Sequence, residues 1–225
     1  MQFRQQSDMS LKSSWVLASL LVICGSGASS DAAPPPERIV SPAKLEDWQE
    51  QSFVGYTSYR VEDGGQGKAL HATANGTASG LCQPLQIDLN SLPIARWNWR
   101  LDRAPPSRGE RTKEGDDQGL RVSFLYQSGT TPESILTVQY VWSQTEPLGA
   151  AWPNAYVKNA YEVVARSGPA APGEWRAEQR DLRADFLAAF GRDIDRVDAV
   201  CLMTDGDQTG ALVEGWYGDI TLQAR

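Results

Sequence analysis

Apolar and polar residues alternate along several stretches of this chain, and this period of two constrains the fold more than any other feature. Between residues 95 and 101 every second residue is apolar, including Trp97 and Trp99, and residues 85–89 and 120–126 repeat the pattern. Such alternation turns one set of side chains into a core and the other toward an exposed face. The three stretches are therefore predicted to be β-strands, with Trp97 and Trp99 in the core.

Further strands are expected wherever apolar and β-branched residues cluster between Gly, Asn and Pro turn signals. These strands cover residues 54–61, 68–73, 135–142, 161–166, 197–203 and 220–222. About ten short strands at this spacing indicate a β-sandwich or a barrel. Residues 184–190 are predicted to form a short helix that ends at Gly191.

The first residues have the features of an export signal. Residues 15–24 form an apolar stretch between a basic start and small residues, and ten residues are too few to span a bilayer as a helix. Residues 1–28 are therefore interpreted as a signal peptide, with a membrane anchor or a buried helix as the alternatives. Cys24 partly fits a lipoprotein motif, so the protein is expected to be periplasmic or secreted, and membrane-bound only if Cys24 is lipidated.

A proline-rich polar segment, residues 29–38, follows and is interpreted as a linker. Residues 39–225 then suit a single β-sandwich domain. The formal net charge of −7 argues against nucleic acid, because binding to phosphates needs a basic face. A neutral sugar or a cation fits this balance better.

Two cysteines, Cys82 and Cys201, lie in the predicted domain. In an oxidising compartment they could form a disulfide, and the alternative is two unpaired small apolar residues in strands. The unpaired interpretation is favoured, because nothing in the sequence shows that the two residues meet.

Several short motifs occur in a fixed order and resemble a bacterial exported family known as domain of unknown function 3047. The motifs are Trp97/Trp99, Lys113–Asp117 with Arg121-Val122, Tyr140–Trp142, Pro153–Tyr156, Trp175 with Arg180-Asp181, Thr204–Gly210 and Tyr217–Ile220. The resemblance runs from about residue 45 to 223. It implies an antiparallel β-sandwich of the jelly-roll type, similar to galactose-binding-like domains and carbohydrate-binding modules, with one short helix. The family has no agreed activity, so the resemblance supports the fold more than the function.

The segment Asp205–Gly210 places side-chain oxygens at alternate positions before a glycine. Clustered hard oxygens are what Ca²⁺ prefers, so Asp205, Asp207 and Thr209 are candidate ligands of a structural calcium ion. The alternative is a turn in which the carboxylates accept hydrogen bonds from backbone N–H groups.

A ligand-binding face is expected where arginines, acidic turns and aromatic residues meet. Arginines donate to sugar hydroxyls or to a uronate, and aromatic rings stack on sugar rings. The alternative roles are structural ion pairs, a solvated acidic loop and core packing. The candidates are Arg100, Asp116, Asp117, Arg121, Trp142, Asn154, Tyr156 and Tyr217.

The single histidine, His71, excludes a zinc site with several histidines and argues against a Ser-His-Asp triad. The sequence therefore favours an exported, non-catalytic β-sandwich that binds a carbohydrate or cell-envelope glycan. One alternative is a jelly-roll glycoside hydrolase or polysaccharide lyase, which needs Asp116 or Asp117 to meet Asp205 or Asp207. Another is an envelope assembly factor that binds a protein.

Overall fold

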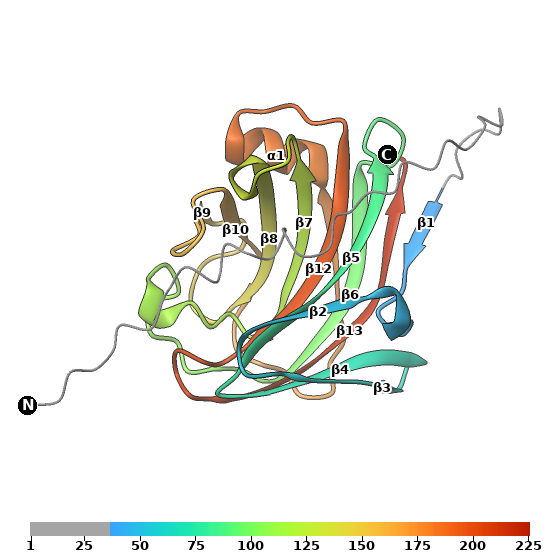
Figure 1. Cartoon of the computed structure of the whole chain (residues 1–225). Helices are drawn as coiled ribbons and strands as arrows, with labels where there is room; N and C mark the ends of the chain where they lie inside the picture. Colours follow the sequence, from blue (N-terminus) through green and yellow to red (C-terminus); the bar gives the residue numbers. More distant parts are fainter. Residues whose placement is uncertain (1–36) are drawn as a thin grey trace, which may run out of the picture.

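A computed structural model describes residues 37–225, which form two packed β-sheets (Figure 1). The predicted signal peptide, Cys24 and most of the predicted linker lie outside the described residues. The last two linker residues, Glu37 and Arg38, lie in strand β1. In the described part of the chain, no helix has the length and apolarity needed to cross a membrane.

The first sheet has six strands. In spatial order they are β11 (Arg176–Asp181), β6 (Ile94–Arg103), β13 (Leu212–Gln223), β4 (Lys68–Asn75) and β3 (Ser58–Asp63), with β1 (Glu37–Val40) paired to the end of β13. All its pairs are antiparallel.

The second sheet has seven strands. Their order is β2 (Gln49–Val54), β5 (Ala78–Asp88), β12 (Arg196–Asp205), β7 (Arg121–Gln127), β8 (Ile135–Ser143), β10 (Ala160–Ser167) and β9 (Ala151–Pro153). Its pairs are antiparallel except β8 with β10, which is parallel. The two-sheet jelly-roll sandwich is thus confirmed, with one parallel pair that the sequence did not predict.

The short helix α1 (Leu182–Phe190) connects β11 of one sheet to β12 of the other and lies across one end of the sandwich (Figure 1). Asp181 caps it by accepting a hydrogen bond from the Ala184 backbone N–H at 3.1 Å. Gly191 ends it with a φ of 64°, a left-handed conformation that glycine adopts without strain. The predicted helix is confirmed and begins two residues earlier than expected. Within residues 37–225, the other helical segments are three 3₁₀ turns: Leu45–Asp47, Lys113–Gly115 and Pro132–Ser134.

The core between the sheets is built on aromatic side chains. Trp97 and Trp99 are 2% and 0% exposed, as predicted, and their rings meet edge to face with centroids 5.6 Å apart. Trp99 also packs against Trp142 of the opposite sheet, at 5.9 Å between centroids. These large buried rings hold the two layers together.

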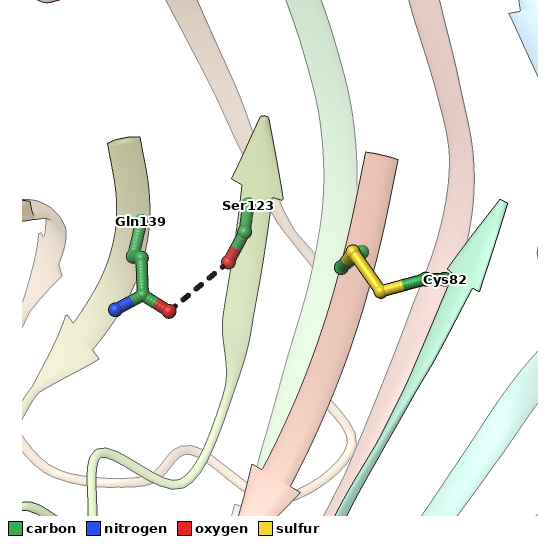
Figure 2. The surroundings of a disulfide bond; sticks show 4 residues. Cys82, Ser123 and Gln139 are labelled. Carbon is green, nitrogen blue, oxygen red and sulfur yellow. Dashed lines mark hydrogen bonds between the residues drawn. A yellow bond between two sulfur atoms is a disulfide. The ribbon is translucent and has the colours of Figure 1, made fainter. Parts of the chain in front are cut away.

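Cys82 and Cys201 form a disulfide, so the favoured prediction of unpaired cysteines was wrong. The two residues lie directly opposite each other on the neighbouring strands β5 and β12, with Cα atoms 4.1 Å apart. Strand pairing brings them together across 119 residues of sequence, and pairing is a property that the sequence pattern does not reveal. Figure 2 shows the disulfide beside Ser123 and Gln139, on the face of the sheet that points away from the core.

Candidate functional site

A groove of about 370 Å³ lies on the outer face of the seven-stranded sheet. Its floor is made by alternate residues of β7, β8 and β12, whose intervening neighbours point into the core. One wall is the 154–159 segment between β9 and β10, and Phe53 of β2 contributes from the opposite edge. Lining residues of the floor are Arg121, Ser123, Leu125, Ile135, Thr137, Gln139, Cys201, Met203 and Asp205.

One half of the floor is apolar. Leu125, Ile135, Ala199 and Cys201 are buried and pack together on this outer face, with Cys82 beside them. Leu125, Ile135 and Cys201 of this cluster also line the groove. This half therefore presents apolar atoms to a ligand.

The other end of the groove is polar and centres on Arg121, whose side chain is only 4% exposed. Its Nη2 lies 3.1 Å from Asp205 Oδ2 and 3.4 Å from Asp116 Oδ2, and it donates to the Asp116 backbone oxygen. Its Nη1 lies 3.4 Å from Glu162 Oε1. Burial works against the charge of Arg121, but the surrounding carboxylates outweigh it and keep the pKa of the guanidinium above its usual value. The guanidinium is therefore committed to protein carboxylates.

Glu162 of β10 is fully buried behind this end of the groove. Its Oε1 accepts hydrogen bonds from Asn154 Nδ2 at 2.7 Å and from Gln139 Nε2 at 2.9 Å. Burial raises its pKa to about 7, and the positive charge of Arg121 opposes that rise. Asn154 in turn accepts from the backbone N–H groups of Tyr156 and Val157, so Glu162 helps to fix the wall of the groove.

The two acidic turns converge at the polar end. Asp117 Oδ2 accepts from the backbone N–H of Thr209 at 2.8 Å and from its hydroxyl at 2.6 Å, while Asp117 Oδ1 accepts from the Gln208 N–H at 3.3 Å. Asp116 and Asp117 are each 3% exposed, so they do not form a solvated loop. Carboxylate oxygens of Asp117, Asp205 and Asp207 all lie within 4.8 Å of one another. Burial raises the pKa of Asp205 well above its usual value.

Gly115 lets the acidic turn fold back on itself. A Cβ atom at this position would lie 2.6 Å from the Gly109 carbonyl oxygen and 2.7 Å from that of Arg108, both of which are backbone atoms. We expect Gly115→Ala to lower the free energy of unfolding by about 1–3 kcal/mol, because the backbone must move to admit the methyl group. Urea unfolding measures the change. The exposed neighbour provides the control, since Glu114→Ala should change stability by less than about 0.5 kcal/mol; equal stability of both variants would contradict the close approach.

The structure brings together only some of the predicted ligand-binding residues. Asp116, Arg121, Asn154 and Tyr156 line the groove, and Asp117 lies at its polar end. Of the predicted metal ligands, Asp205 lines the groove, Asp207 lies beside it, and Thr209 binds Asp117.

Three predicted ligand-binding residues lie elsewhere. Trp142 is 2% exposed and Tyr217 1% exposed, because both point into the core, where their rings cannot reach a ligand in the groove. Arg100 lies on the other sheet, where it pairs with Asp102 at 2.9 Å and stacks over Trp216. The expectation of one surface carrying both Arg100 and Arg121 was therefore wrong, since β6 and β7 belong to different sheets.

Sequence reasoning missed Glu162 and Gln139. Each is a polar residue flanked by apolar neighbours on both sides, and that interruption was the available signal. Phe53 and Met203 were also missed, and they carry no signal beyond their apolar character.

Several solved structures resemble this one. A family 11 carbohydrate-binding module of the cellulosomal cellulase Lic26A-Cel5E of Clostridium thermocellum matches with a TM-score of 0.47 and 9% identity, over 86% of this chain and 97% of that one. A family 30 module of the cellulase Cel9D-Cel44B of the same organism matches with a TM-score of 0.45 and 10% identity, over 80% and 92%. The endoglucanase cel12A from Rhodothermus marinus matches with a TM-score of 0.44 and 13% identity, over 85% and 98%.

No curated protein matches the chain by sequence. A sequence profile does match, over residues 46–221, and this range includes every strand that forms the groove. The profile is that of the family described as "Protein of unknown function (DUF3047)", and the chain belongs to this family.

Proposed function

We propose that this protein is an exported, non-catalytic β-sandwich that binds a carbohydrate or cell-envelope glycan in the groove of the seven-stranded sheet. The observation that carries the proposal is the division of the groove into an apolar half around Leu125 and Ile135 and a polar end around Arg121. A pyranose ring has apolar C–H faces and a rim of hydroxyl groups. The floor around Leu125 and Ile135 suits such a face, while Thr137, Asn159 and Lys158 bring polar groups to its edge.

Tyr156 is the aromatic residue of the wall, and it is half-buried. Its hydroxyl donates to the Lys113 backbone oxygen at 2.8 Å, and the Lys113 ammonium lies 5.3 Å from the ring centroid. These contacts hold the ring in place before a ligand arrives, which lowers the entropy lost on binding.

The charge around the groove favours a neutral glycan over a uronate. Both terminal nitrogens of Arg121 are engaged by Asp116, Asp205 and Glu162, and the side chain is only 4% exposed, so it is poorly placed to bind a ligand carboxylate. The surrounding carboxylates would repel an acidic sugar. A neutral glycan, rather than a uronate bound by the arginine, is therefore the expected ligand.

We expect Tyr156→Ala to weaken glycan binding at least about fivefold, which corresponds to about 1 kcal/mol of aromatic contact. Isothermal titration calorimetry with neutral and uronate oligosaccharides measures the affinity. Tyr156→Phe keeps the ring but loses the hydroxyl bond to Lys113 that holds it, so its affinity should lie between those of wild type and Tyr156→Ala. Tyr56→Ala is the matched control, because Tyr56 is 70% exposed and does not line the groove. Equal affinity of wild type and Tyr156→Ala would place the binding site elsewhere.

The hydrolase alternative has one observation in its favour, which is the convergence of Asp117 with Asp205 and Asp207. A retaining hydrolase places its two carboxyl groups about 5–5.5 Å apart on either side of the substrate bond. Here both carboxylate oxygens of Asp117 already accept hydrogen bonds from Gln208 and Thr209. The three carboxylates also lie next to one another, with oxygens within 4.8 Å, so we favour binding without hydrolysis. Release of new reducing ends from a bound glycan would decide for the hydrolase, and binding to a protein without any glycan would decide for the assembly factor.

Export is tested by cell fractionation with mass spectrometry of the mature amino terminus. Cleavage near residue 28 yields a soluble periplasmic or secreted chain, whereas acylation at Cys24 yields a membrane-bound one.

A further inference from the structure

We propose that Asp117, Asp205 and Asp207 hold a divalent, oxygen-preferring cation at the polar end of the groove. The proposal does not depend on glycan binding. Asp117 comes from the turn before β7, whereas Asp205 ends β12 and Asp207 follows it, and each contributes an oxygen to a group that spans no more than 4.8 Å. Two of the three are essentially buried, at 3% exposure for Asp117 and 0% for Asp205.

Asp205 provides an independent sign of a missing partner. Its Oδ2 is paired with Arg121 at 3.1 Å, but its Oδ1 is buried and accepts no hydrogen bond among the described residues. A buried carboxylate oxygen without a partner costs about 1–3 kcal/mol or more, so native proteins seldom leave one unsatisfied. A cation bound between Asp205 and its two neighbours would satisfy it.

The excess of buried negative charge also favours a bound cation. Asp116, Asp117, Asp205 and Glu162 are all buried, and Arg121 is the one buried cationic side chain among the described residues. Buried carboxylates are normally paired or bound to a metal ion. One guanidinium cannot neutralise four of them, whereas a divalent cation would offset most of the remainder.

Hydrogen bonds already orient two of the ligands. Thr209 and the backbone of Gln208 hold Asp117, and Gln208 Nε2 donates to Asp207 Oδ2 at 2.7 Å. Such outer contacts fix the direction of the metal ligands before the metal binds. Thr209, which the sequence suggested as a ligand, therefore becomes a residue that positions Asp117, and Asp117 takes its place in the ligand set.

The donor set indicates the class of cation. All three groups are carboxylates, with no nitrogen or sulfur, so the site suits a hard ion such as Ca²⁺ rather than a transition metal. Ca²⁺ takes six to eight oxygens, so three carboxylates leave room for further oxygen ligands. Asp205 lines the groove, which would place the ion next to a bound ligand.

The experiment uses the full chain, stripped with EGTA and then titrated with CaCl₂ in a calorimeter at neutral pH, with thermal unfolding followed in parallel. We expect saturable binding and a higher unfolding midpoint in Ca²⁺. Asp207→Asn should weaken binding at least about tenfold, as expected for the loss of a ligand. Asp207 is the least buried of the three, so this variant is expected to fold, and far-UV circular dichroism checks that it does.

Asp195→Asn is the matched control, because Asp195 is exposed and lies outside the cluster. It should bind Ca²⁺ as the wild type does. The absence of any Ca²⁺ binding by folded wild-type protein would overturn the proposal, as would equal binding by wild type and Asp207→Asn. An increase in stability from pH 7 to pH 5, with no effect of Ca²⁺ at either pH, would instead show that shared protons neutralise the carboxylates.

Discussion

Replacing Arg121 by methionine is expected to lower the free energy of unfolding by about 3–5 kcal/mol, because three buried carboxylates lose their partner. Methionine has a similar length and fills the space, so the loss reports on charge rather than on packing. Urea unfolding in EGTA at neutral pH measures the change without a contribution from bound cations. The control is Arg111→Met, in which an exposed arginine loses a surface pair with Glu146. That variant should lose much less stability.

The loss in Arg121→Met should also depend on pH. Burial raises the pKa of Glu162 to about 7 in the folded protein, against an ordinary value of 4.5, and removing Arg121 raises it further. A carboxyl with a raised folded pKa contributes stability that is present below its unfolded pKa and is lost as pH rises through the folded pKa. The difference between variant and wild type should therefore be largest near about pH 8 and shrink toward about pH 5. A difference that does not change with pH would contradict the electrostatic explanation.

The elements of the fold could be predicted because alternation is a local signal. The stretch around Trp97 and Trp99 predicted β6 to within a residue or two at either end. Residues 135–142 were harder to interpret, since apolar residues occupy both faces of β8. Val141 points outward but is buried under Trp152 and Val164, which hides the alternation that turns Trp142 into the core.

The site could be predicted only in part, because the sequence of one strand does not reveal which strands lie next to it in the sheet. The acidic turns were recognised, and the hydrolase alternative already required that they converge, as they do. Arg100 and Arg121 were both expected on the ligand-binding face, but β6 and β7 lie in different sheets. Glu162 lies at the site because β10 runs parallel to β8, an arrangement that neither strand indicates alone.

Removal of the Cys82–Cys201 disulfide is expected to lower the free energy of unfolding by about 5 kcal/mol in the loop-entropy picture, because the bond closes a loop of 119 residues. The effect is large because the unfolded chain gains freedom, whereas the folded strands keep their antiparallel pairing around the bond. Urea unfolding of a Cys82→Ala/Cys201→Ala variant measures the change. Both the reference protein and the variant carry Cys24→Ser, so that Cys82 and Cys201 are the only cysteines in the reference chain.

The disulfide also links stability to the groove, since Cys201 lies in its floor, opposite Ser123 of β7. If the bond acts only by restricting the unfolded chain, the double alanine variant should bind glycan with unchanged affinity once it is folded at low temperature. If the sulfur atoms form part of the apolar floor, the same variant should lose affinity as well as stability, because two methyl groups leave a depression where the disulfide stood. Ligand-induced shifts of the unfolding midpoint in wild type and variant separate the two roles. Equal stability of variant and wild type in urea would contradict the presence of the bond itself.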